Sequence, residues 1–129
     1  MCTRVESAIS VTLVKVIDPA HATDGFSTPE AGRHYAAVQV KLTNTGAGTY
    51  NDAPSNGAKV LDAQGQSFAA DIAVTTDAGA GFANEDVNLA PGSSEIGVLV
   101  FQVPDGTHIS KFQFGLDSGF AQTGEWVVG

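Results

Sequence analysis

Hydrophobic and polar residues alternate along the segment 34–48, HYAAVQVKLTNTGAG. The apolar residues that share one face of an extended chain are Ala36, Val38, Val40 and Leu42. The other face carries polar side chains at Gln39, Lys41 and Thr43. Because a period of two is typical of a strand that buries one face, this segment is predicted to be a central strand. The glycine-rich and asparagine-containing turn at 44–48 is predicted to end it.

Six further segments are predicted to be strands. In the first, from Ile9 to Ile17, the apolar residues change face near Leu13, which indicates a β-bulge. The segment 95–103 is apolar on both faces, which is typical of a strand in the interior of a sheet. The others are a hairpin of 58–61 and 67–72 around the turn 62–65, and two strands near the C-terminus at 109–116 and 125–128.

Polar segments rich in Gly, Pro, Ser and Thr separate the predicted strands. They are 18–32, 49–57 and 75–88, and the first is long enough to be a surface excursion. No segment has a sustained period of 3.6 residues, so no long helix is predicted. About seven strands separated by such loops predict an all-β protein, an immunoglobulin-like antiparallel β-sandwich. We expect one domain at 9–129, preceded by a flexible N-terminus at 1–8.

Composition and charge narrow the class of partner. The chain has 14 acidic and 6 basic residues, a formal net charge of −8, and its basic residues are scattered singly. We therefore expect no binding of nucleic acid or of an anionic membrane surface. Membrane insertion is not expected either, because no apolar run reaches the roughly 18 residues of a membrane span. The single cysteine, Cys2, cannot form an internal disulfide and is interpreted as an exposed residue rather than a lipid acceptor.

Three segments of the chain resemble a known family. They are VTLVKVI at 11–17, YAAVQVKLTNTG at 35–46, and LAPG at 89–92 followed by GVLVFQVP at 97–104. Together they resemble the telokin-like immunoglobulin-fold domains of unknown function found in secreted and lipid-anchored proteins of Gram-positive bacteria, a group similar in fold to a mycobacterial secreted antigen. The resemblance implies an extracellular or cell-surface location, with lipid anchoring through a removed or truncated N-terminal region as one form of it. The richness in Ala, Gly and Val favours an actinobacterial origin.

No motif for catalysis or for a structural metal is recognisable. His21, His34 and His108 lie far apart, without the spacing that places two ligands on one face of an element, and are interpreted as solvated surface residues. The sequence contains neither a G-x-S-x-G nucleophile motif nor a phosphate-binding glycine loop. The family resemblance likewise implies no catalytic residues. We therefore predict that the protein is not an enzyme and needs no cofactor.

Aromatic residues in glycine-rich loops are the candidate binding residues. They are Phe26, Tyr50, Phe82 and Phe120. If these rings are exposed together, they form a recognition patch for a protein or a cell-envelope polymer. The alternative is that each ring folds inward and closes an open end of the sandwich. The leading hypothesis is thus a binding or interaction module without catalytic activity.

Acidic residues in loops are the candidate metal ligands. The main group is Asp71, Asp77, Glu85 and Asp86, and further acidic loop residues are Asp24, Asp52 and Asp62. Carboxylates from neighbouring loops, together with backbone carbonyls, can complete the coordination shell of Ca²⁺. The alternative is that these carboxylates remain hydrated and keep the protein soluble. The second functional hypothesis is therefore a structural or sensory domain of the cell surface that binds a cation such as Ca²⁺.

Overall fold

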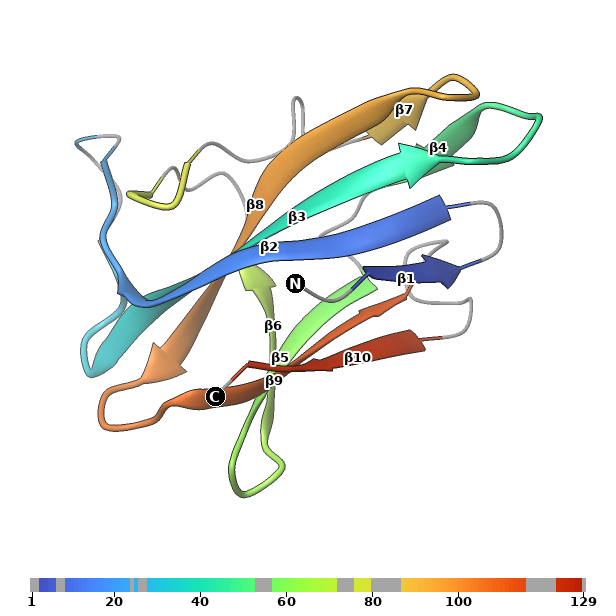
Figure 1. The fold of residues 1–129 in the computed structure, drawn as a ribbon. Coiled ribbons are helices and arrows are strands. Elements are labelled where there is room, and N and C mark those ends of the chain that lie inside the picture. The colour runs from blue at the N-terminus through green and yellow to red at the C-terminus, as the bar shows by residue number, and fades with distance from the viewer. Residues whose placement is uncertain are drawn as a thin grey trace.

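The computed structural model contains ten β-strands in the residues that it describes, which are 3–6, 9–23, 25, 28–52, 57–71, 76–79, 87–115 and 123–128. The strands are β1 (Thr3–Glu6), β2 (Ile9–Ala20), β3 (Arg33–Asn44), β4 (Tyr50–Asp52), β5 (Ala58–Asp62), β6 (Ser67–Asp71), β7 (Val87–Leu89), β8 (Ser94–Pro104), β9 (Ile109–Gly115) and β10 (Thr123–Val127). The prediction of an all-β antiparallel sandwich is confirmed (Figure 1). The structure has three strands more than the seven predicted, namely the short strands β1, β4 and β7 of three or four residues.

The strands form two layers that are joined at β6. Eight strands make a continuous sheet in the order β1-β2-β3-β8-β6-β5-β9-β10, and β4 and β7 pair in a second, small sheet. In Figure 1, β2, β3 and β8 lie in the upper layer and β5, β9 and β10 in the lower one. β6 pairs with β8 through Ala70 and Asp71, and with β5 through Ser67–Ala69. β6 therefore belongs to both layers.

β3 is the central strand of the upper layer, as predicted. It pairs with β2 on one side and with β8 on the other, and its residues Ala36, Val38, Val40 and Leu42 are fully buried. The β2–β3 register shifts between Leu13 and Lys15, which confirms the predicted bulge. β2 continues along β3 as far as Ala20, with a second register shift between Ile17 and Ala20. The surface excursion predicted at 18–32 therefore begins later, and Asp18 lies in a strand.

The main hydrophobic core lies between the two layers and is centred on Phe112. The ring of Phe112 stacks on Phe114 with 6.2 Å between centroids and meets the edge of Phe101 at 6.4 Å. The ring of Trp126 lies 5.4 Å away. All four side chains are buried. Burying a large apolar side chain contributes about 1.5–3 kcal/mol, so this cluster is a main source of stability.

A second, smaller apolar cluster lies on the outer face of the upper layer. Its buried members are Ala20, Tyr35, Ala37, Ala78, Val98 and Val100. The segment 76–79 covers this face, and the position that a Cβ of Gly79 would take is 3.5 Å from the side chains of Gln39 and Val98. The same segment is tied to the end of β2, since the backbone N–H of Asp77 donates to the carbonyl of His21 at 2.9 Å.

Two predicted loops contain short strands, and the sheet begins before residue 9. β4 lies in the predicted loop 49–57, and β7 begins at the end of the predicted loop 75–88. Their ladder joins only three residue pairs, which is too short for a hydrophobic period to be recognised in sequence. At the N-terminus, β1 pairs antiparallel with β2, so the segment 1–8, expected to be flexible, contributes an edge strand to the upper layer.

Candidate functional site

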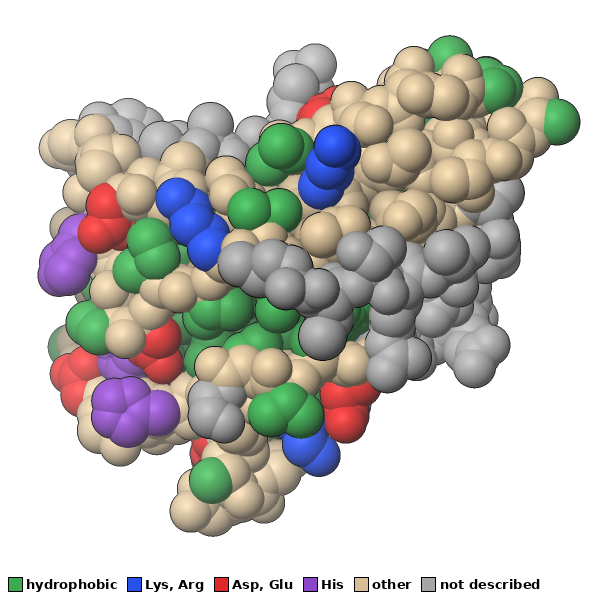
Figure 2. Space-filling model, in the orientation of Figure 1, with side chains coloured by type: hydrophobic (Ala, Val, Ile, Leu, Met, Phe, Trp, Pro, Cys, Tyr) green, Lys and Arg blue, Asp and Glu red, His purple; other side chains and the backbone are tan. Residues whose placement is uncertain are grey.

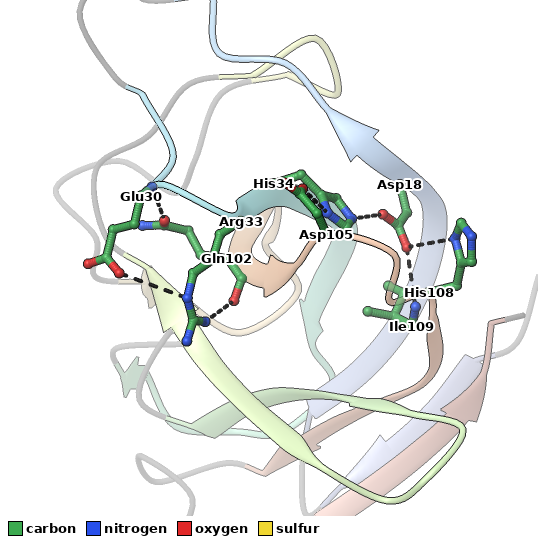
Figure 3. A network of polar contacts seen from close by, with 8 residues as sticks. All are labelled: Asp18, Glu30, Arg33, His34, Gln102, Asp105, His108 and Ile109. Atoms are coloured by element: carbon green, nitrogen blue, oxygen red, sulfur yellow. Dashed lines mark hydrogen bonds and ion pairs between the residues drawn. The ribbon is translucent and has the colours of Figure 1, made fainter.

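Polar side chains from distant segments meet at one end of the sandwich (Figure 3). They are Asp18, Glu30, Arg33, His34, Gln102, Asp105 and His108. The β3–β8 ladder pairs Arg33 with Pro104 and His34 with Val103, so the start of β3 and the end of β8 lie side by side. In Figure 2, histidine (purple) and acidic (red) side chains gather at the left end of the face shown.

His34 points into the sandwich between two carboxylates. It shares the inner face of β3 with Ala36, since side chains alternate along a strand. Its Nε2 lies 2.7 Å from Oδ1 of Asp18, and its Nδ1 lies 3.3 Å from Oδ1 of Asp105. A neutral imidazole can donate to only one of these oxygens, whereas a protonated ring donates to both. The side chain is 19% exposed, so the prediction of a solvated histidine is wrong for His34.

The carboxylate of Asp18 joins the two layers. Oδ1 accepts the hydrogen bond from His34 in β3, and Oδ2 accepts one from the backbone N–H of Ile109 in β9, at 3.2 Å. This side chain is only 11% exposed. Burying a charge is unfavourable unless it is paired and hydrogen-bonded, so these contacts hold the ends of β2, β3 and β9 together. We call Asp18, His34 and Asp105 the end cluster.

The two other histidines are exposed, as predicted, and also face carboxylates. His108 is 83% exposed, and its Nδ1 lies 4.0 Å from Oδ2 of Asp18. His21 is 75% exposed, and its Nδ1 lies 3.3 Å from Oδ2 of Asp77. Such exposed pairs contribute little to stability. Within the described residues, the side chain of each of the three histidines thus faces a carboxylate, and only that of His34 is largely buried.

A groove adjoins the end cluster where β6 separates from β8. It encloses about 430 Å³ and is lined by Glu30, Arg33, Ser67, Phe68, Ala69, Ala70 and Gln102. β6 pairs with β8 only at Ala70 and Asp71, and the two strands then diverge. In the part of the chain that the structure describes, no strand pairs with Ser67–Ala69 on the side away from β5. The groove therefore borders a short, open strand edge.

Glu30, Arg33 and Gln102 form a fixed wall of this groove. The backbone N–H of Glu30 donates to Oε1 of Gln102 at 2.7 Å, and Nη1 of Arg33 donates to the backbone carbonyl of Gln102 at 3.2 Å. A turn that ends in a hydrogen bond from Arg33 N–H to the Glu30 carbonyl, at 3.0 Å, holds the two residues together. Nε of Arg33 lies 3.8 Å from Oε2 of Glu30, whose side chain is 77% exposed.

The aromatic candidate residues are only partly covered by the structure. Tyr50 lies in β4 and packs, partly buried, against the main core. For this residue the structure shows the inward alternative rather than an exposed ring. Phe26, Phe82 and Phe120 lie outside the described residues. A recognition patch formed by these three phenylalanines stays a prediction.

The acidic candidate residues are also only partly covered. Asp77 is described, and a hydrogen bond from the backbone N–H of His21 is the largest cause that lowers the pKa of Asp77 below its usual value. Asp71 ends β6, but its side chain, like Glu85 and Asp86, lies outside the described residues. Among the side chains that the structure covers, no three His, Cys, Asp or Glu could jointly hold a metal ion. Calcium binding by this group stays a prediction.

Asp62 has a structural role that sequence reasoning missed. It is buried, and its Oδ1 accepts hydrogen bonds from the backbone N–H groups of Gln64 and Gln66, both at 2.9 Å. An aspartate that bonds the backbone two residues further along is a common device of tight turns. Asp62 therefore stabilises the turn between β5 and β6, and it is not a free loop carboxylate.

The end cluster and the groove wall escaped sequence reasoning because their partners are distant along the chain. His34 is 16 residues from Asp18 and 71 from Asp105, and Glu30 is 72 from Gln102. One signal was present in the sequence: His34 continues the inward phase of Ala36 and Val38. A polar side chain in that phase requires a buried partner, but the sequence does not say which one.

Comparison with known proteins shows a family and a fold. A family model described as a domain of unknown function, DUF4352, matches residues 5–124. No curated protein matches the sequence. Within the described residues, no helix has both the length and the apolar character required to cross a membrane.

Solved structures with the same fold come from several Gram-positive species and from a mycobacterium. The protein ycdA of Bacillus subtilis, described as a lipoprotein, has a TM-score of 0.69 and 13% identity, and the match covers 98% of this chain but only 38% of ycdA. A β-sandwich protein of Clostridium difficile has a TM-score of 0.59 and 11% identity, over 98% and 89% of the two chains. The secreted protein MPT63 of Mycobacterium tuberculosis has a TM-score of 0.57 and 11% identity, over 98% and 90%.

Proposed function

This chain belongs to the DUF4352 family of domains of unknown function, and we propose that it is a binding module without catalytic activity that works outside the cytoplasm. The observation that carries this proposal is the groove between β6 and β8, with its open strand edge at Ser67–Ala69. Unpaired edges are templates for pairing with another chain. The proposed ligand is an extended protein segment that adds as a strand to this edge.

The proposed location rests on the structural neighbours. One neighbour is described as a lipoprotein and another as a secreted protein. At 11–13% identity these likenesses show the fold alone, so an extracellular or cell-surface location, with or without a lipid anchor, is part of our proposal. The telokin-like immunoglobulin classification belongs to the same proposal and is supported by the antiparallel two-layer architecture.

The short edge limits the affinity that strand addition can provide. Three residues of β6 can offer about three backbone hydrogen bonds, and each contributes a net ~1 kcal/mol. Ordering the ligand segment opposes this gain. A gain of ~3 kcal/mol corresponds to a dissociation constant of several millimolar, so strand addition alone gives millimolar or weaker binding. Additional affinity has to come from side chains of the groove, such as the ring of Phe68 and the polar wall.

A display experiment tests this proposal with the full chain. Random heptapeptides on phage are selected against the immobilised protein, because multivalent display retains weak binders. The test variant is Ala69→Gln, which places a bulky neutral side chain in the groove, and the control is Ala63→Gln in the β5–β6 turn, where the alanine is also exposed. We expect selected peptides to bind the wild type and the control, and to lose binding to Ala69→Gln.

Nuclear magnetic resonance locates the bound peptide. A selected peptide added to the ¹⁵N-labelled protein is expected to shift the amide signals of Ser67–Ala70 and Gln102 most strongly. Shifts confined to another face would contradict the assignment of the groove. If no peptide is enriched and only cell-wall polysaccharide binds the protein, the proposal of a protein ligand is wrong.

A further inference from the structure

The carboxylate of Glu30 is held at the rim of the groove and is largely unused. The backbone of Glu30 is fixed by its N–H bond to Gln102 and by the carbonyl that accepts from Arg33. Its side chain is nevertheless 77% exposed, and the ion pair with Arg33 involves only Oε2, at 3.8 Å. Within the described residues, Oε1 has no partner. A second cation can therefore approach this carboxylate from the groove.

Arg33, in contrast, is largely committed within the protein. Its Nη1 donates to the carbonyl of Gln102 and its Nε faces Glu30, and its side chain is 40% exposed. These contacts reduce the number of donors that an incoming anion would find. Arg33 therefore holds the wall in place and leaves Glu30 as the more accessible charge of the groove.

The net charge of the whole chain is negative and, like the Glu30 carboxylate, attracts cations. With 14 acidic and 6 basic residues, the net charge is −8. A field of this sign attracts cationic ligands and raises their association rates, and it repels anionic ones. Both the Glu30 carboxylate and the net charge of the chain therefore favour a positively charged ligand.

We propose that the groove selects an extended peptide segment that carries a lysine or arginine, whose cationic group binds the Glu30 carboxylate. This inference rests on the proposed function and adds the charge of the ligand to it. The peptide backbone pairs with the edge of β6, and the cationic side chain reaches across the groove to the wall formed by Glu30, Arg33 and Gln102. Arg33 acts as a positioning residue for that wall.

Peptide selection against matched variants tests the inference. The heptapeptide library is selected in parallel on the wild type, on Glu30→Gln and on Glu95→Gln, which removes the same charge at the opposite end of β8. We expect lysine and arginine to be enriched about threefold at one peptide position with the wild type and with Glu95→Gln. With Glu30→Gln this enrichment disappears, and with Glu30→Lys it changes to aspartate and glutamate.

The outcomes separate this inference from the proposed function. If peptides bind at the groove without a preference for basic residues, or with the same preference in Glu30→Gln, the inference is overturned and the strand-addition proposal stands. Enrichment of acidic residues by the wild type would also overturn it. If no peptide binds, both proposals fail. Circular dichroism of each variant confirms that an altered selection reflects the groove rather than loss of the fold.

Discussion

Asp18 and His34 show how a polar pair can occupy inward-facing strand positions. Both side chains are largely buried, yet each polar atom of the pair has a partner in another segment of the chain. In the described residues, no buried side-chain nitrogen or oxygen lacks a hydrogen-bond partner. The contribution of each residue to stability therefore depends on the others, because removing one residue leaves a buried charge with fewer hydrogen-bond partners.

Replacing His34 is expected to destabilise the protein. His34→Ala removes the hydrogen bond to Oδ1 of Asp18 and leaves this carboxylate with the Ile109 N–H as its hydrogen-bond donor among the described residues. We expect the free energy of unfolding in urea to fall by about 1–3 kcal/mol. His108→Ala is the control, since its ring is exposed and 4.0 Å from Asp18, and it should change stability by less than about 0.5 kcal/mol. Equal effects of the two substitutions would show that the end cluster is not a structural tie.

Asp77 makes the attachment of the segment 76–79 sensitive to acid. The pKa of Asp77 is lowered in the folded protein, chiefly by the hydrogen bond from the backbone N–H of His21. The ionised carboxylate therefore stabilises the fold fully above the unfolded pKa of an aspartate, about 4. This stabilisation is lost as the pH falls through the lower pKa of the folded state. Between about pH 5 and pH 2 we expect the amide proton of His21 to change its chemical shift with a midpoint below 4. In Asp77→Asn this titration should be absent. A midpoint above 4 in the wild type would contradict the hydrogen bond.

The strands differ in how far the sequence predicts them. Strands of five or more residues, such as β3 and β8, have enough positions for alternation or continuous burial to be recognised. β4 and β7 form by tertiary pairing of three residues each, and no local sequence pattern predicts such pairing. The end cluster and the groove depend on where β2, β3, β6 and β8 meet. For this reason local periodicity predicted the layers, but it could not identify the residues that gather at their end.

The β5–β6 hairpin links the turn chemistry of Asp62 to the groove. The buried carboxylate of Asp62 accepts two backbone hydrogen bonds in the turn, and the turn sets the direction in which β6 leaves β5. Asp62→Ala is expected to lower the free energy of unfolding by about 1–3 kcal/mol and to speed amide hydrogen exchange in β6. Asp62→Asn keeps an oxygen acceptor and should have a smaller effect on both measurements. If exchange in β6 is as slow in Asp62→Ala as in the wild type, the turn does not stabilise the edge of the groove.

At the scale of the whole molecule, the groove borders the main core at Phe68 and Ala70, whereas its exposed residues Glu30 and Ala69 lie outside the core. The main core is built from the facing sides of the two layers, whereas the groove and the end cluster lie where β6 and the strand ends leave these layers. Substitutions on the exposed groove residues therefore change the surface without removing the large apolar side chains of the core. Variants at these exposed positions are therefore suitable for binding experiments.

Phe112 provides the test of the two-layer core. Its ring contacts Phe101 of the upper layer and Phe114 and Trp126 of the lower layer, and Phe112→Ala removes these contacts together. We expect the free energy of unfolding to fall by about 3–5 kcal/mol, a large share of the roughly 5–15 kcal/mol that stabilises a typical domain. Val127→Ala on β10 is the control, because Val127 is 74% exposed in the strand paired with β9. Chemical denaturation that gave both variants the same midpoint would mean that the layers do not close on Phe112, and the assignment of both core and groove would have to be abandoned.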